Sequence, residues 1–463
     1  MVDIRNTDLN SLSKGELITI IYKLFEENEL LRIRISDLEE KLNQKGKSGN
    51  LKKEIPLWVK ANVKNKETGK RKKRLNTFVR MKDVPTNTVF HSHEKCPKCD
   101  GVLGKPSVCY SRQIIDIPIS PAVVTEHVIF KRYCNSCKER FYPKPDLSSS
   151  VVGSHRIGVN LMALISTMKE ELRLPIGKIK DHLQVFYHLK LSEGEIVNIF
   201  HKVALFGKPQ YEAIKQTILK SNVIHADETG GRENGRNGYF WNFSNTTHQF
   251  LLYKHSRGSK VVREILGIDG ENFEGVLTTD FYAAYNEYSG FHQRCWVHYL
   301  RDIKALKEEY PKDKLLKTWS KDIYRLYEIA KKYSGPPDNI PIGLQEQMRE
   351  EKEKYFKEKL SNICNQHLEK QTVFSTLNAR ALKYISELFT FVRFPNVLSD
   401  NNLAERSLRH LVVSRKISGG TRSAKGSETK SILASLFGTW RLQNLNPFEQ
   451  TRNLLLQASC QRP

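Results

Sequence analysis

Apolar residues repeat at heptad spacing through the first segment of the chain, residues 1–45. One row of the seam is formed by Leu17, Leu24, Leu31 and Leu38, and the other by Ile21, Asn28, Ile35 and Leu42. Aliphatic residues with a single Asn at position a favour a parallel two-stranded coiled coil, because a buried Asn pairs best with the same Asn of its partner. We therefore expect a homodimer. The alternative is an amphipathic helix that packs against its own chain.

Residues 150–220 have the pattern of several short helices. Apolar residues 161–165 begin one, Pro175 opens a second and Ser192 caps a third. Short helices with tight turns indicate either a helix-turn-helix that enters the major groove of DNA or a plain helical connector. We expect DNA contact from this segment.

The pattern changes at residue 221, where short apolar runs alternate with helical ones through residue 299. The expected strands are Val223–Ala226, Tyr239–Ser244, Gln249–His255, Val276–Thr279 and Gln293–Val297. Lys260–Leu266 is expected to be a helix before the fourth strand, and Tyr282–Tyr288 a short helix after it. This order is typical of a ribonuclease H-like α/β core.

Helical patterns continue to the end of the chain. Residues 300–395 are charged and predict an all-helical insertion, with a break at residues 335–337. Residues 396–463 predict a further core helix and C-terminal helices, interrupted by a glycine-rich stretch at 418–426.

The charge balance adds a polyanionic partner to this picture. The 463 residues include 75 Lys and Arg against 51 Asp and Glu, a formal net charge of +24. Neutralising phosphates releases condensed counterions, so we expect nucleic acid as the partner. The linker at 46–90 contains the basic run Lys70, Arg71, Lys72, Lys73 and Arg74, which is either a solvated tract or a phosphate contact. No signal peptide or membrane-spanning run is present, which favours a soluble cytoplasmic protein.

Two CxxC pairs lie within residues 91–145. Cys96 and Cys99 form the first pair, and Cys134 and Cys137 form the second. Four thiolates in two pairs predict a structural Zn²⁺ ribbon, which has no open position for catalysis. Strand-like stretches at Arg112–Ile119 and Val123–Tyr133 separate the pairs.

Two aspartates follow expected strands of the core. Asp227 comes after the first strand and Asp280 after the fourth, and these strands are neighbours in a ribonuclease H-like sheet. Carboxylates held this close repel each other unless a cation lies between them. Mg²⁺, with Mn²⁺ as a substitute, is the natural occupant.

A third carboxylate is expected from a later helix. Glu405 is the best candidate, beside a buried stripe on a helix that Ser399 or Asp400 caps. Periodicity alone leaves Asp400 as a rival ligand. The nearby basic residues are expected to contact the DNA backbone: Arg406, Arg409, Arg415, Lys416, Arg422 and Lys425. Asn402, Cys295 and His298 are expected to support the site, with Cys295 buried and His298 hydrogen-bonded.

Four motifs in order resemble those of transposases of the insertion sequence sixty-six family. They are HADETG, GVLTTDFYAAYN, CWVHYLRD and DNNLAERSLR, the last followed by RKISGG. The resemblance covers nearly the whole chain and implies a DDE transposase with Asp227, Asp280 and Glu405 as its acidic triad. It also implies metal-dependent cleavage at transposon ends and 3′-hydroxyl transfer into target DNA.

The implied mechanism is two-metal phosphoryl transfer, with ions roughly 3.5–4 Å apart activating the nucleophile and stabilising the leaving oxygen. The implied partners are double-stranded DNA and, in addition, accessory proteins encoded by the element. The alternatives are a ribonuclease H-like nuclease that does not join DNA and a non-catalytic DNA-binding regulator.

Overall fold

The computed structural model describes residues 83–115, 117, 121–153, 155–267, 271–368 and 371–460. The chain divides after Ile115 into two compact units. The expected coiled coil at 1–45 and the basic run at 70–74 lie outside the described residues.

The two CxxC pairs occur in different units. In the first unit a backbone bridge between Lys95 and Val102 closes the turn that contains Cys96 and Cys99. In the second unit β1 (Arg132–Cys134) and β2 (Glu139–Phe141) form an antiparallel hairpin around the other pair. The strand expected at 112–119 is wrong for its described residues, and the one expected at 123–133 is right only for Arg132 and Tyr133, because the described residues of 112–131 make no strand pairing.

Three helices follow the hairpin: α2 (Val159–Glu170), α3 (Ile176–Tyr187) and α4 (Glu193–Leu219). Their starts agree with the sequence, since Pro175 precedes α3 and the Ser192 side chain accepts the Glu195 amide at 3.1 Å. The expectation of short helices is wrong for α4, which has 27 residues and passes through Pro209. Packing of its apolar face stabilises a helix of this length.

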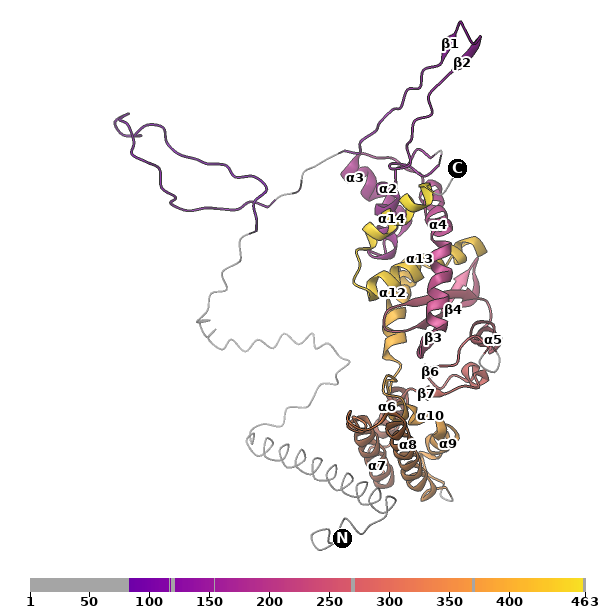
Figure 1. Ribbon diagram of the computed structural model, residues 1–463. Coiled ribbons are helices and arrows are strands. Elements are labelled where there is room, and N and C mark those ends of the chain that lie inside the picture. Colours follow the sequence, from indigo (N-terminus) through magenta and orange to yellow (C-terminus); the bar gives the residue numbers. More distant parts are fainter. Residues whose placement is uncertain are drawn as a thin grey trace. The chain divides into compact units, whose positions relative to one another are not determined.

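A five-stranded mixed sheet lies at the centre of the second unit (Figure 1). Its strands are β3 (Val223–Glu233), β4 (Arg236–Ser244), β5 (Gln249–Lys254), β6 (Val276–Thr279) and β7 (His292–Arg294). Helix α5 (Lys260–Leu266) and the 3₁₀ helix η3 (Ala283–Glu287) flank β6 in sequence. The spatial order is β5-β4-β3-β6-β7, so the first and fourth strands of the series are neighbours, as expected.

Strand β3 is longer than the sequence suggested. Asp227 lies within it rather than after it, and pairing with β4 continues from Asp227↔Asn242 to Glu233↔Arg236. The two-residue turn Asn234-Gly235 has positive φ at both residues, the conformation that suits a tight hairpin. This turn allows the strand to continue through Thr229, Gly230 and Gly231.

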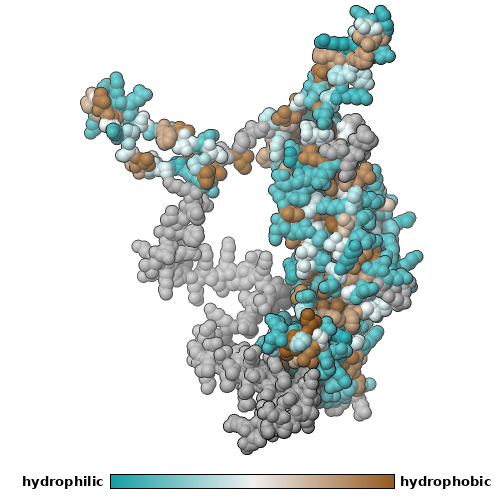
Figure 2. Space-filling view, in the orientation of Figure 1, coloured by the Kyte–Doolittle hydropathy of each residue, from teal (hydrophilic) through white to brown (hydrophobic). Residues whose placement is uncertain are grey.

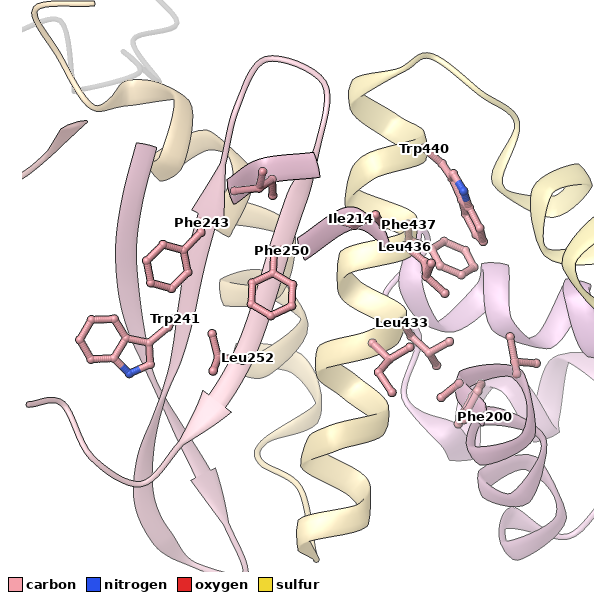
Figure 3. Packing of buried hydrophobic residues seen from close by; sticks show 14 of the residues in the cluster. Phe200, Ile214, Trp241, Phe243, Phe250, Leu252, Leu433, Leu436, Phe437 and Trp440 are labelled. Carbon is pink, nitrogen blue, oxygen red and sulfur yellow. The ribbon is translucent and has the colours of Figure 1, made fainter. Parts of the chain in front are cut away.

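The two faces of the sheet carry different helices. On one face, Leu408 and Leu411 of α12 (Asn402–Ser418) pack against Phe240 and Leu251. The opposite face contributes to the main core, in which aromatic and aliphatic residues of β4 and β5 pack with residues of α4 and α13 (Figure 3). Its labelled members include Phe200, Ile214, Trp241, Phe243, Phe250, Leu433, Leu436 and Trp440.

Helix α13 (Ala424–Leu442) covers the free edge of β5. Its Ser435 and Thr439 hydroxyls accept the backbone amides of Leu251 and Gln249 at 2.8 and 3.1 Å. These bonds satisfy donors that an edge strand otherwise leaves to solvent. The final described helix is α14 (Pro447–Cys460).

Residues 296–393 form a helical insertion with its own core. It comprises α6 (Trp296–Glu309), α7 (Lys314–Lys331), α8 (Ile342–Asn365), α9 (Ser375–Lys383), α10 (Ile385–Leu388) and α11 (Thr390–Arg393). Its core is rich in rings, including a stacked pair formed by Trp319 and Phe374. The expected strand at 293–297 is wrong beyond Arg294, because the Trp296 amide bonds the Ser399 carbonyl and begins α6.

Hydrophilic side chains cover most of the visible face of the second unit (Figure 2). No helix in the described part of the chain is long and apolar enough to cross a membrane.

Candidate active site

Asp227 lies in β3, and Asp280 directly follows β6, the parallel strand beside it. The register pairs His225 of β3 with Thr278 of β6, and the same offset places Asp227 opposite Asp280. Side chains alternate between the faces of a strand, so the Asp227 carboxylate points to the face that α12 covers, and the charge of Asp280 acts on it. Each accepts a nearby backbone amide at 2.9 Å, Asp227 from Glu228 and Asp280 from Tyr282.

Helix α12 brings Glu405 to the same face. Its Leu408 and Leu411 anchor it on the sheet. Glu405 occupies the first turn, and its Oε1 atom is buried without a hydrogen-bond partner in the described structure. The expected cap is wrong, because Asn401 takes the cap position while Asp400 accepts the amide of Asn402 at 3.0 Å.

The three carboxylates interact electrostatically. Burial raises the pKa of Asp227 to about 7, and the charges of Glu228, Asp280 and Glu405 contribute to the rise. Glu405 acts on Asp227, whereas Asp400 acts on the neighbouring His225 and Cys295. Asp280 and Glu405 therefore both lie close enough to Asp227 to act on it electrostatically. Across the described residues, however, no three His, Cys, Asp or Glu side chains already lie in a metal-binding arrangement.

Glu228 is a fourth acid that the sequence analysis missed. It follows Asp227 in β3, so its side chain lies on the opposite face. There it accepts the Arg257 guanidinium at 2.7 and 3.0 Å and the Tyr285 hydroxyl at 2.7 Å. Arg257 in turn stacks over the Tyr282 ring at 4.0 Å. The sequence signal that could have distinguished the two acids is the alternation of side chains along a strand, which places Glu228 and Asp227 on opposite faces of the sheet.

Arg294 anchors the backbone around Asp280. This fully buried side chain donates to the carbonyl oxygens of Asp280 at 2.9 Å and Tyr282 at 3.4 Å. Its Nε donates to Glu387 of α10 at 2.6 Å. Arg294 thus joins the helical insertion to the strand end that positions Asp280. No local sequence signal pairs residues so far apart in the chain.

Asn401 fixes the start of α12 against β3. Its side chain donates to the Ala226 carbonyl at 2.7 Å and contacts His225 Nδ1 at 3.2 Å. Its backbone amide donates to the Cys295 sulfur at 3.2 Å. Burial lowers the pKa of His225 to about 4 and raises the pKa of Cys295 to about 11. Both groups are therefore neutral at physiological pH.

The expected supporting residues fall into two groups. Cys295 is buried, as expected, and lies beneath α12. His298 Nε2 lies 3.6 Å from Glu405 Oε1, beyond hydrogen-bond distance, and His298 Nδ1 is buried with no partner in the described structure. A hydrogen-bonded His298 is therefore wrong, although the residue does lie beside Glu405. Asn402 is half-buried, and its backbone amide donates to the Asp400 carboxylate.

The basic residues after Glu405 lie along α12 and beyond it. Arg415 is half-buried and donates to the Thr229 hydroxyl at 3.1 Å. The other members are exposed: Arg406, Arg409, Lys416, Arg422 and Lys425. Exposure leaves these cations available to a polyanion.

Each CxxC pair forms a tight turn around its first sulfur. Backbone amides of Lys98 and Cys99 lower the pKa of Cys96, and the backbone amides of Cys137 and Ser136 lower the pKa of Cys134. The Cys137 amide lies 3.5 Å from the Cys134 sulfur. Because the pairs belong to different units, a shared zinc ion stays a prediction.

Known proteins match this chain over most of its length. The family model described as "Transposase IS66 family" matches residues 155–429, more than half of the chain. The chain is also 21% identical over 389 residues to "Uncharacterized protein y4jD" of Sinorhizobium fredii (strain NBRC 101917 / NGR234), covering 78% of this chain and 74% of that relative. The matched range includes the sheet, the helical insertion and α12 with all three grouped carboxylates. The chain belongs to the IS66 family of transposases.

Proposed function

We propose that this transposase cleaves DNA at the ends of a mobile element and joins the 3′-hydroxyl ends to target DNA at a site formed by Asp227, Asp280 and Glu405. The grouping of these acids is the observation that supports the proposal most strongly. The strand order β5-β4-β3-β6-β7, with carboxylates on β3 and after β6, supports a ribonuclease H-like core.

The donor set fits a hard divalent cation. The raised pKa of Asp227 reflects burial and three neighbouring acids, a cost that a cation removes. The buried Glu405 Oε1 lacks a hydrogen-bond partner within the described structure and is free to act as a ligand. Oxygen ligands of this kind suit Mg²⁺ or Mn²⁺, which we propose Asp227, Asp280 and Glu405 hold. When bound, the ions supply charge neutralisation at the attacking and leaving oxygens.

The protein's own residues position the reacting groups. Arg294 fixes the backbone that carries Asp280, and Asn401 fixes the first turn that carries Glu405. Arg406 and Arg409, exposed beside Glu405, are suited to hold the phosphodiester backbone on either side of the scissile bond. These contacts hold the acidic side chains in place before the reaction, which keeps the electrostatic environment preorganised.

We also propose the following organisation for the regions outside this site. The heptad pattern at 1–45 supports a homodimer that brings two DNA ends together, and the two cysteine turns support a structural zinc ribbon. DNA contact by α2–α4, participation of element-encoded accessory proteins and a nucleoid location are part of the same proposal.

The test is a cleavage and joining assay on DNA that carries an element end, with Mg²⁺ and mapping of new 3′ ends. Asp227→Ala, Asp280→Ala and Glu405→Gln are each expected to abolish cleavage and joining while DNA binding persists. Asp400→Asn is the matched control, because it changes the acid that precedes α12, and it is expected to retain both steps. Strand transfer near the parent level by any triad variant removes that residue from the proposal. Cleavage without joining by the parent indicates a nuclease instead.

A further inference from the structure

The β3–β4 hairpin extends well past the carboxylates and ends in a tip at Asn234-Gly235. The tip is held by the pairing of Glu233 with Arg236 and by positive φ at both turn residues. Glu233 comes six positions after Asp227 in the strand, which at about 3.3 Å per residue amounts to roughly 20 Å. The hairpin is therefore a projection of fixed length measured from the active site.

A second segment lies against this tip. After α12 the chain runs beside the end of β3, where the Thr421 amide donates to the Arg232 carbonyl and the Asn234 amide donates to the Thr421 carbonyl, both at 2.8 Å. Gly420 permits this approach, because any Cβ at that position collides with the Arg232 carbonyl oxygen. We call residues 232–236 together with 419–425 the basic tip.

The basic tip carries four cationic residues: Arg232, Arg236, Arg422 and Lys425. All four are exposed, and none forms an ion pair within the described structure. The acid at the tip, Glu233, is engaged by Ser427 and His255. Four unneutralised cations on a projection with few acids favour a polyanion as the partner.

Helix α12 connects the basic tip to the carboxylates. Its first turn carries Glu405, which acts on Asp227, and its Arg415 bonds Thr229 further along β3, so the helix runs alongside β3 in the same direction. Arg406, Arg409 and Lys416 lie on its exposed side. From Arg406 to Lys416 the helix rises about 15 Å. Cations thus continue from the active site to the tip.

We propose that the basic tip is a second contact for duplex DNA, binding its phosphate backbone about six base pairs from the scissile phosphate. For a duplex that lies along β3, the distance follows from the roughly 20 Å between Asp227 and Glu233 and the rise of 3.4 Å per base pair along each strand. The contact is to phosphates and therefore independent of sequence. The distance of six base pairs rests on the proposed function, because that function places the scissile phosphate at the carboxylates. The binding of DNA by the basic tip does not depend on it.

The test measures the binding of a fluorescent mixed-sequence DNA duplex by the full-length protein in EDTA, across a series of NaCl concentrations. The variant is Arg232→Ala/Arg236→Ala/Arg422→Ala/Lys425→Ala. The matched control removes the same charge from exposed positions of α7: Lys314→Ala/Lys317→Ala/Lys321→Ala/Arg325→Ala. The slope of log K against log [NaCl] is expected to weaken in the tip variant by about 0.9 for each phosphate that this variant no longer neutralises, and to stay unchanged in the control.

Each outcome decides the inference. An unchanged slope in the tip variant overturns it, as does an equal change in both variants or an absence of DNA binding by the parent. Gly420→Ala provides a charge-neutral check, because displacing residues 419–425 is expected to weaken the slope in the same direction. Binding is measured without metal, so a parent that binds through the tip but never cuts DNA contradicts the proposed function alone. Where cleavage occurs, phosphate ethylation about six base pairs from the cut is expected to inhibit the parent and not the tip variant.

Discussion

The buried ion pair between Arg294 and Glu387 offers a direct test of how the helical insertion supports the active site. Arg294 is fully buried, whereas the Glu387 side chain is 26% exposed. Replacing Glu387 with Ala leaves the guanidinium buried without its counter-ion, although its bonds to the Asp280 and Tyr282 carbonyls remain. Removing one partner of a buried pair costs about 3–5 kcal/mol, and the partial exposure of Glu387 places this change near the lower end.

The matched control lies in the same insertion. Arg380 and Asp302 form an ion pair whose side chains are 31% and 47% exposed. A surface pair of this kind contributes about 0–1 kcal/mol. Asp302→Ala is therefore expected to change the free energy of unfolding far less than Glu387→Ala, even though both changes remove one carboxylate.

The assay is urea unfolding followed by tryptophan fluorescence, since Trp296 and Trp319 lie in the core of the insertion. A double-mutant cycle with Arg294→Met isolates the pair, because the double variant no longer has an uncompensated buried charge. We expect Arg294→Met/Glu387→Ala to be more stable than the sum of the single changes predicts. We also expect Glu387→Ala to lower strand transfer, because Arg294, which holds the Asp280 carbonyl, loses its ion pair with α10. Equal destabilisation by Glu387→Ala and Asp302→Ala would refute the reasoning.

Three further predictions concern the site and the cysteine pairs. In EDTA, Asp227→Asn is expected to stabilise the protein above about pH 7 by up to about 4 kcal/mol. The pKa of Asp227 in the folded state is about 7, above its ordinary value of 3.8. The folded protein therefore pays no free-energy cost for ionising Asp227 below pH 3.8 and the full cost above pH 7. Thermal unfolding at several pH values checks this, and a stability difference between variant and parent that does not change with pH contradicts it. Asn401→Ala is expected to lower the free energy of unfolding by about 1–3 kcal/mol, as urea unfolding measures, because it leaves the Ala226 carbonyl unsatisfied. It is also expected to lower DNA joining more than DNA binding when both are assayed. Equal loss of joining and binding argues against a positioning role for Asn401. Cys96→Ser is expected to remove the zinc bound to the purified protein, as metal analysis measures, and full zinc content shows that the two pairs do not share an ion.

The sequence was most informative where local pattern and chemistry coincide. The apolar run before Asp280 matches β6, and Lys260–Leu266 matches α5. The periodic apolar residues of α12 correctly indicated the helix that carries Glu405. The order of strands and helices was sufficient to make β3 and β6 neighbours and thus to bring Asp227 beside Asp280.

Long-range contacts set the features that the sequence did not reveal. The expected first strand ended with its apolar run at Ala226, but pairing with β4 and the Asn234-Gly235 turn continue the strand past Asp227. Trp296 suits a strand by propensity, yet its packing in the insertion and its bond to the Ser399 carbonyl make it the first residue of a helix. The contacts of Arg294 with Glu387 join residues that are 93 positions apart, so no local pattern contains them.

The most direct measurement of the central claim is the anomalous diffraction of crystals soaked in Mn²⁺. We predict a manganese peak among the carboxylates of Asp227, Asp280 and Glu405, and its disappearance in the Asp227→Asn variant. The absence of a peak at these carboxylates in the parent protein, or binding of Mn²⁺ through Asp400 instead of Glu405, contradicts the account.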